Sequence, residues 1–269
     1  MLRFSGVALS HVGLVRTGNE DSGFLGPTCM LVADGVGGAA AGEVASATAA
    51  YVVSASALAT PAGDPVTLLG SAIELAQAQV ALGVQRDPRR AGMATTLTAV
   101  ATDGERFALA HVGDSRGYLF RDGTLTRVSH DHTWVQRLVD EGSLAERDVP
   151  FHPWRNVVTR SINGDPSEAG DVIDLHLAAG DRVLLASDGL TDLVPDADIE
   201  ALLARHDDDA AVEAMVDAAL AAGGRDNVTC LLATVVEGPA VSADGLLVGA
   251  VRDPRNVVDA AAVRMPHSA

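Results

Sequence analysis

The predicted helices of this chain come in adjacent pairs, and the predicted strands lie together between those pairs. Two helical segments, about 44–59 and 65–83, follow the first strands, and two more, about 196–205 and 208–222, precede the last strand. A doubly wound parallel sheet needs strands that alternate one by one with helices. The order therefore argues against that architecture and favours an α+β fold with two antiparallel sheets and helix pairs on the outside.

Strands are indicated by apolar residues at alternate positions or in short runs between turn residues. The expected strands are 7–15, 29–33, 96–102, 106–112, 116–120, 125–128, 172–177, 182–186 and 228–236. Asp103-Gly104 and Asp122-Gly123 are typical hairpin turns. We therefore expect 96–128 to form one antiparallel meander. We also expect 172–177 and 182–186 to pair as a further hairpin.

The charge balance narrows the possible partners. The chain has 269 residues, a formal net charge of −17, and 19 basic residues that are all arginine. Nucleic acids and anionic membranes are bound through a positive surface, so neither is expected as a partner. Most of the carboxylates are expected to be solvated, and a few to be clustered around metal ions.

Cysteine usage and the lack of targeting signals favour a cytoplasmic protein. Cys29 and Cys230 lie in apolar runs without CxxC spacing, which is typical of free core thiols in a reducing compartment. The first residues lack a basic segment followed by an apolar one, so no signal peptide is expected. The stretch 44–59 is too rich in Ala, Ser and Thr for a membrane span. We expect a monomer without a membrane partner.

Three apolar runs end abruptly in an aspartate. They end in Asp34, Asp114 and Asp188, and a fourth acid, Asp226, stands directly before the last strand. Strand ends that meet at one rim of a sandwich would bring these acids together. Like charges at that separation cannot all ionise unless a cation neutralises them. Oxygen-only ligands favour Mg²⁺ or Mn²⁺ over Zn²⁺.

Asp-Gly is also an ordinary turn dipeptide, and the two interpretations must be weighed. For Asp103 and Asp122, which stand between alternating strands, the turn is the better interpretation. Asp34 and Asp188 follow fully apolar runs with no partner strand directly after them. Metal binding is the better interpretation at these two positions.

One polar turn adds an arginine and two acids to the candidate site. Arg16, Glu20 and Asp21 lie between the first two strands. An arginine beside metal-binding carboxylates is either their ion-pair partner or a bidentate clamp for a phosphate group. The pattern by itself leaves both roles open.

Seven short motifs resemble those of the metal-dependent Ser/Thr protein phosphatases of the PP2C-like (PPM) family, in its bacterial form. The motifs are Val15–Ser22, Val32–Gly38, Gly42–Ser46, Gly92–Thr96, His111–Arg116, Ala186–Gly189 and Gly224–Thr229. Each motif is weak, but seven in the family's order and spacing over about 5–237 are highly specific. The resemblance implies a four-layer α-β-β-α sandwich over residues 1–237, with a flap at about 131–165.

The resemblance also implies a ligand set for two tightly bound Mn²⁺ or Mg²⁺ ions. Asp34 would bridge the two ions, and the carbonyl of Gly35 would bind one of them. Asp188 and Asp226 would complete the first site, and Glu20 would hold the second ion.

Three further residues receive roles by the same resemblance. Asp114 would help to bind a third, weaker ion, Asp21 would orient water, and Arg16 would grip the substrate phosphate. Animal members carry a histidine after the Asp-Gly pair as the proposed general acid, where this chain has Val36. The proton donor is therefore open. By chemistry alone the candidates are His130, His132 and His152.

The implied activity is hydrolysis of phosphoserine and phosphothreonine by a metal-bound water or hydroxide. Ser/Thr kinases and their substrates would be the partners in bacterial signalling. The alternative is a non-catalytic or regulatory phosphatase-like module. The presence of Glu20, Asp34, Asp188, Asp226 and Arg16 favours the enzyme.

Residues 238–269 differ in composition from the rest and form a C-terminal extension. Only Leu246–Val251 resembles a strand. An exposed apolar hexamer is an aggregation hazard. We therefore expect it to dock on the domain as an added strand or strap, in a tail that is otherwise partly disordered.

Overall fold

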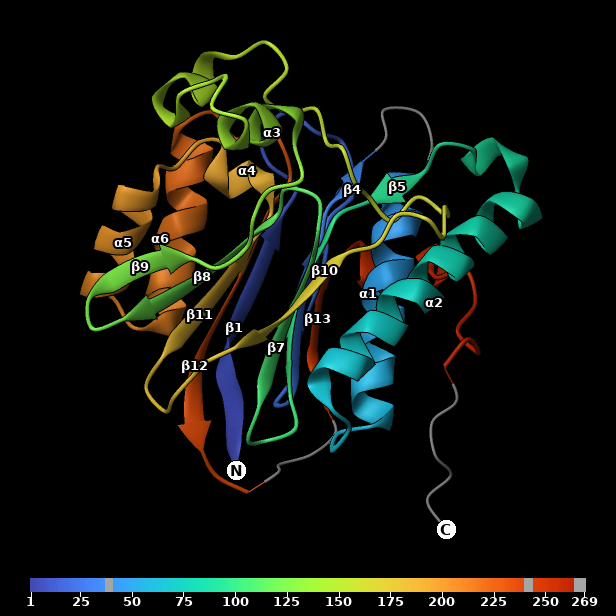
Figure 1. The fold of residues 1–269 in the computed structure, drawn as a ribbon, viewed down its shortest axis with the longest axis horizontal. Coiled ribbons are helices and arrows are strands. Elements are labelled where there is room, and N and C mark those ends of the chain that lie inside the picture. Colours follow the sequence, from blue (N-terminus) through green and yellow to red (C-terminus); the bar gives the residue numbers. More distant parts are fainter. Residues whose placement is uncertain (37–40, 240–243, 264–269) are drawn as a thin grey trace.

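The computed structural model describes residues 1–36, 41–239 and 244–263 as two antiparallel sheets packed face to face between two pairs of helices (Figure 1). Apolar side chains from both sheets fill the space between them, among them Phe4, Val32, Leu185 and Leu231. The predicted α+β sandwich of four layers, α-β-β-α, is confirmed.

All strand pairs in the described residues are antiparallel. The first sheet has the order β1 (Leu2–His11), β12 (Val228–Glu237), β11 (Arg182–Ala186), β8 (Arg116–Arg121), β9 (Thr124–Arg127). The second has the order β10 (Asp171–Leu175), β7 (Phe107–Val112), β6 (Leu97–Thr102), β3 (Cys29–Ala33), β2 (Ser22–Leu25), β13 (Leu246–Gly249). A small ribbon pairs β4 (Gly35–Val36) with β5 (Ala94–Thr95).

The helices cover the outer faces of the two sheets. The α-helices are α1 (Gly42–Ala59), α2 (Pro65–Arg86), α3 (Trp134–Asp140), α4 (Asp188–Thr191), α5 (Asp196–Arg205) and α6 (Asp208–Ala221). Short 3₁₀ turns span Pro88–Arg90, Glu146–Phe151, Ala250–Arg252 and Pro254–Asn256. The pair α1 and α2 packs on the second sheet, and α5 and α6 pack on the first.

Helix α2 is long and apolar enough by composition to cross a membrane. Its apolar face, including Leu69, Ala76 and Val80, is buried in the core beside α1 and the second sheet. A core helix and a membrane span share these properties, so composition alone does not distinguish them.

The predicted meander over 96–128 is wrong at its centre. The hairpins β6–β7 and β8–β9 form at Asp103-Gly104 and Asp122-Gly123 as expected. However, β7 and β8 belong to different sheets, and the chain crosses between them at Gly113, whose φ is 105°. Alternation shows which residues are buried but not which strand is the neighbour, so the crossing was not visible in the sequence.

Two other local predictions also fail. The segments expected to pair as a hairpin separate, because β10 pairs with β7 in one sheet and β11 lies between β12 and β8 in the other. The sequence Ser143-Leu-Ala-Glu146 has the pattern of a capping box, which predicts a helix start at Ser143, but this cap does not form. The turn there begins after Ala145, with no side-chain cap. A four-residue signature is too short to outweigh the packing of the flap.

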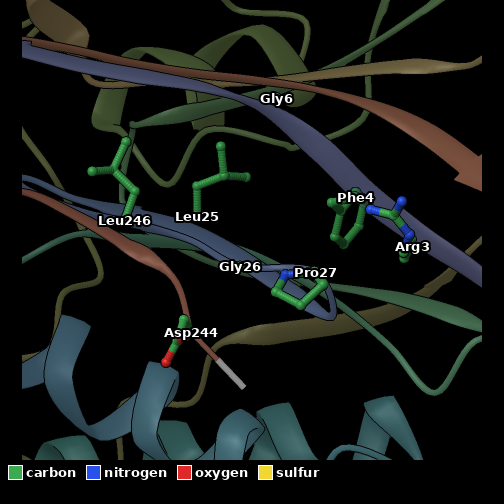
Figure 2. A pocket seen from close by; sticks show the side chains of 8 residues that line it. All are labelled: Arg3, Phe4, Gly6, Leu25, Gly26, Pro27, Asp244 and Leu246. Atoms are coloured by element: carbon green, nitrogen blue, oxygen red, sulfur yellow. The ribbon is translucent and has the colours of Figure 1, made fainter. Parts of the chain in front are cut away.

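The segment Leu246–Gly249 pairs with β2 and covers the edge of the second sheet. A small cavity of about 250 Å³ lies where this segment approaches β1 and the turn between β2 and β3 (Figure 2). Its walls include Phe4, Leu25, Pro27 and Leu246. The extension is therefore part of the folded domain in the described residues.

Candidate active site

The strand-end acids lie at one rim of the sandwich. Asp34 directly follows β3, and Asp114 and Asp188 each stand two residues after the last residue of β7 and β11. Asp226 stands two residues before the start of β12. All four carboxylates are half-buried. A cleft of about 720 Å³ opens here between the rim and the flap. Its lining includes Asp114, Asp188 and Asp226 on one side and flap residues such as Val139 on the other.

Three of these acids hold protons more tightly than usual. Burial raises the pKa of Asp34 well above its ordinary value, and the charges of Asp21, Asp188 and Asp114 raise it further. Burial and neighbouring acids also raise the pKa of Asp188 to about 6 and that of Asp114 to about 8. Interaction with the carboxyl group of Asp188 also contributes to the raised pKa of Asp34. The rim therefore carries more acid than its own basic groups balance.

Asp21 lies just behind this rim and is fully buried. The hydroxyl of Ser187 donates to its Oδ2 at 2.8 Å, whereas its Oδ1 has no hydrogen-bond partner in the described residues. Burial raises the pKa of Asp21 to about 7, against the hydrogen bonds from Thr229 and Ser187. A buried carboxylate oxygen without a donor is costly unless a cation or a water approaches it.

Arg16 and Asp226 form an ion pair across the mouth of the site, with 2.7 Å between Nη2 and Oδ2. This hydrogen bond, with the charges of Asp226, Glu20 and Asp34, raises the pKa of Arg16. Burial, together with the charge of Glu43, raises the pKa of Glu20. Of the two roles open for Arg16, the ion pair is the one seen here.

Two consecutive threonines hold the backbone at Asp34: Thr95, the last residue of β5, and Thr96, which follows it. The N–H of Asp34 donates to Oγ1 of Thr96 at 3.0 Å, and its carbonyl accepts from Oγ1 of Thr95 at 2.8 Å. Oγ1 of Thr96 also lies 2.7 Å from Oγ of Ser115, the residue after Asp114. Thr96 therefore joins the strand ends that carry two of the acids, a positioning role that the sequence reasoning missed.

Asn227 is a second positioning residue that the sequence reasoning missed. Its side chain is buried and accepts from the N–H of Glu20 at 2.8 Å. Its amide nitrogen donates to the carbonyls of Val12 and Gly18, both at 2.9 Å. One side chain thus holds the turn that carries Arg16 and Glu20 against the start of β12. The only signal for it was its place directly after Asp226.

Two oxygens meet in a narrow space beside the first turn of α1. A Cβ added at Gly42 would collide with Oε2 of Glu20 and lie 2.9 Å from the carbonyl oxygen of Gly35. The N–H of Gly35 donates to the carbonyl of Glu20 at 3.2 Å. Glycine at position 42 therefore leaves room for the Glu20 carboxylate and the Gly35 carbonyl oxygen beside the start of α1.

These residues fit Mn²⁺ or Mg²⁺ by their chemistry. The donors are oxygens, their charge is unbalanced, and Oδ1 of Asp21 has no partner in the described residues. Within that part of the chain, however, no three Asp, Glu, His or Cys side chains already stand at the spacing of a metal cluster. Asp226 is instead paired with Arg16, and this ion pair must open before its Oδ2 can bind a cation.

The three flap histidines point to other partners. His130 contacts Asp140 and His132 contacts Asp171, at 2.9 and 3.0 Å from their Nε2 atoms. Nδ1 of His152 accepts from the N–H of Trp154. None of the three is among the residues that line the cleft in the described part of the chain.

The fold and the acid-lined rim are those expected of the metal-dependent phosphatases that the sequence motifs resemble. The sequence model of the family described as Protein phosphatase 2C matches residues 19–235. This chain belongs to that family.

Two curated relatives illustrate the similarity. The serine/threonine protein phosphatase PstP of Mycobacterium tuberculosis is 40% identical over 252 residues, which are 93% of this chain and 48% of that protein. The serine/threonine phosphatase stp of Listeria welshimeri is 33% identical over 231 residues, 82% of this chain and 91% of that protein. This chain thus spans about half the length of the mycobacterial relative.

Solved structures support the same relationship. A crystal structure of PstP from M. tuberculosis superposes with a TM-score of 0.82 and 40% identity, covering 87% of this chain and 100% of that one. The catalytic domain of PstP in complex with two manganese ions gives a TM-score of 0.80 and 40% identity, covering 88% and 100%.

Proposed function

We propose that this chain is a metal-dependent protein serine/threonine phosphatase that uses two tightly bound Mn²⁺ or Mg²⁺ ions. The observation that carries the proposal is the gathering of Asp34, Asp114, Asp188 and Asp226 at one rim with raised proton affinity at three of them. Carboxylates in this state are neutralised by protons in the absence of metal and by divalent cations in its presence.

The ligands for the two ions are part of the proposal. Asp34 would be shared between them, with Asp188 and Asp226 on one side, and Glu20 and the Gly35 carbonyl on the other. When bound, the ions supply Lewis acidity and lower the pKa of a water molecule toward neutrality. Two observations support this arrangement: the Glu20 carboxylate and the Gly35 carbonyl oxygen both lie beside Gly42, and the pKa values of Asp34 and Asp188 are raised.

The protein's own groups then have separate tasks. Arg16, released from Asp226, binds the phosphate oxygens through its guanidinium group, which matches them bidentately. The unpartnered Oδ1 of Asp21 accepts a hydrogen bond from a water molecule and orients it. Asp114 would contribute to a third, weaker ion on the flap side of the cleft.

The proposed substrates are phosphoserine and phosphothreonine residues of proteins. Ser/Thr kinases and the proteins that they phosphorylate are the proposed partners, since they supply this substrate. A cytoplasmic location is also proposed, because both cysteines are buried free thiols, as expected in a reducing compartment.

The proposal is tested by turnover of a phosphothreonine peptide with Mn²⁺, Mg²⁺ or EDTA. Activity that requires either metal and is lost in EDTA is the expected result. Full activity in excess EDTA would exclude the two-metal centre. Binding of the peptide without turnover in either metal would favour the non-catalytic, regulatory module instead.

A further inference from the structure

The C-terminal strap, residues 246–260, packs against the back of the candidate active site. It comprises β13, the 3₁₀ turns Ala250–Arg252 and Pro254–Asn256, and the four residues that follow. The family model matches residues 19–235, so the strap lies beyond the part of the chain that the model covers.

The strap binds the backbone of the acidic turn directly. The N–H of Ala250 donates to the carbonyl of Asp21 at 2.7 Å, and the N–H of Val251 donates to Oγ of Ser22 at 3.1 Å. Both strap residues are buried, at 8% and 4% exposure. Buried hydrogen bonds of this kind fix the peptide plane of the accepting residue, and with it the direction of its side chain.

A short relay extends this contact to Glu20. Oγ of Ser22 lies 3.0 Å from Oγ of Ser46 on α1, and Oγ of Ser46 donates to the carbonyl of Glu20. The strap, α1 and the acidic turn thus share one buried chain of hydrogen bonds. It holds the carbonyls of two consecutive acids, Glu20 and Asp21.

The approach of the strap to the turn depends on a glycine. Gly249 has φ of 74°, and a Cβ there would collide with the carbonyl oxygen of Asp21. Only glycine allows both the left-handed backbone and the contact. Its position opposite Ser22 in the β13–β2 pair sets the register of the strap.

The other end of the strap is anchored away from the site. The side chain of Asn256 donates to the carbonyl of Ala250 at 2.9 Å, and the N–H of Val258 donates to Oγ1 of Thr48 at 3.1 Å. Nη1 of Arg86 donates to the carbonyl of Val258, and the hydroxyl of Tyr51 to that of Ala260, both at 2.7 Å. The strap is therefore held at both ends, and its contact with the acidic turn lies in an anchored part of the chain.

We propose that the strap is a positioning element for the acidic turn, and that Gly249, Ala250 and Val251 set the orientation of Glu20 and Asp21 toward the metal centre. The proposal rests on the metal-dependent function proposed above. Partners in the outer shell of a metal site commonly change metal affinity by about 10- to 100-fold. The strap would act in this way through backbone groups, although it contributes no ligand.

The test is the Mn²⁺ affinity of full-length variants, measured calorimetrically at a temperature where all are folded. Gly249→Val, which displaces the strap from Asp21, should weaken binding of one Mn²⁺ by about ten-fold. Ser22→Ala, which removes the acceptor of the Val251 N–H, should act in the same direction. Both changes disrupt the same contact, the one between the strap and the acidic turn. The double variant should therefore bind Mn²⁺ no more weakly than the Gly249→Val protein.

The matched control is Tyr51→Phe, which removes a strap hydrogen bond far from the acidic turn. It should lower the melting temperature slightly and leave Mn²⁺ affinity unchanged. Hydrogen exchange at the Ala250 amide reports whether the strap has left the turn. Faster exchange with unchanged Mn²⁺ affinity in both Gly249→Val and Ser22→Ala would overturn the proposal. The affinity measurement does not need turnover, so it tests the strap separately from the proposed function. Absence of phosphatase activity in the wild-type protein would contradict only the proposed function.

Discussion

The two ends of β11 carry aspartates in opposite electrostatic states. Asp181, just before the strand, receives two hydrogen bonds from Arg121 at 2.7 and 2.6 Å, which hold its pKa below the ordinary value. Asp188, just after the strand, lies among other acids, and burial raises its pKa to about 6. The same residue type on the same strand is a stabilised carboxylate at one end and a proton-binding group at the other.

The difference shows which acids are structural and which are available for chemistry. On the surface, Asp64 also has a lowered pKa, held down mainly by hydrogen bonds from Thr67 and also by its ion pair with Arg106. Of the four rim acids, only Asp226 has an arginine ion-pair partner, Arg16, within the described residues. The fold therefore leaves the remaining rim acids for a cation.

The largest expected effect comes from Asp34→Asn, which removes the proposed shared ligand while keeping the shape of the side chain. We expect Mn²⁺ binding to be lost and kcat to fall by about 10³-fold or more. Calorimetric titration and phosphopeptide turnover measure the two effects. Asp181→Asn is the matched control and should keep both. Two tight sites in the Asp34→Asn protein would contradict the shared role.

Asp114→Ala should separate the third ion from the other two. Because Mg²⁺ and Mn²⁺ keep several waters at weakly held sites, we expect the two tight sites to stay occupied while kcat falls about 100-fold. Metal titration of the folded variant, with circular dichroism as the check on the fold, measures this. Loss of both tight sites would make Asp114 a core ligand, and unchanged activity would make it only a turn residue.

Arg16→Ala should weaken catalysis without weakening metal binding. The lost charged hydrogen bonds are worth about 1.5–3 kcal/mol, or about 10- to 100-fold in kcat/KM. Steady-state kinetics and Mn²⁺ titration separate the alternatives. If Mn²⁺ affinity collapses while KM is unchanged, the ion pair with Asp226 is the main role of Arg16.

The pH dependence of stability should differ between the two ends of β11. The pKa values of Asp188, Asp21 and Asp114 are raised to about 6, 7 and 8, so the folded metal-free protein binds protons that the unfolded chain, with pKa near 3.8, has released. Their contribution to the free energy of unfolding is complete at pH values below the pKa of the unfolded chain. It is lost as the pH rises through the folded-state pKa values of about 6 to 8. In EDTA, the melting temperature should fall by several degrees over that range.

Saturating Mn²⁺ is the control for this prediction, because cations stabilise the ionised acids and should reduce the fall. Asp181 acts at the other end of the scale. Because its pKa is lower in the folded protein, Asp181 stabilises the fold at pH values above its pKa in the unfolded chain. That contribution is lost as the pH falls through its pKa in the folded protein. A melting temperature in EDTA that rises steadily from pH 6 to 8 would contradict the high proton affinity of the rim.

Much of the architecture could be predicted because its signals are local. The helix pairs, the strand 29–33 and the hairpin turns at Gly104 and Gly123 follow from periodicity and turn residues. The strand-end positions of Asp34 and Asp188 follow from the apolar runs before them. The crossing at Gly113 and the separation of β10 from β11 could not be predicted, because strand pairing depends on partners far away in the sequence.

The sequence by itself determined which residues are acidic, which strands end in them, and the set of motifs typical of the family. Only the tertiary structure decided which groups surround each acid: an arginine at Asp181, other acids at Asp188, Asn227 beside Glu20, and the strap behind Asp21. The physical reason is that proton affinity and orientation depend on burial and on neighbours contributed by distant segments. Those neighbours come together only when the two sheets pack.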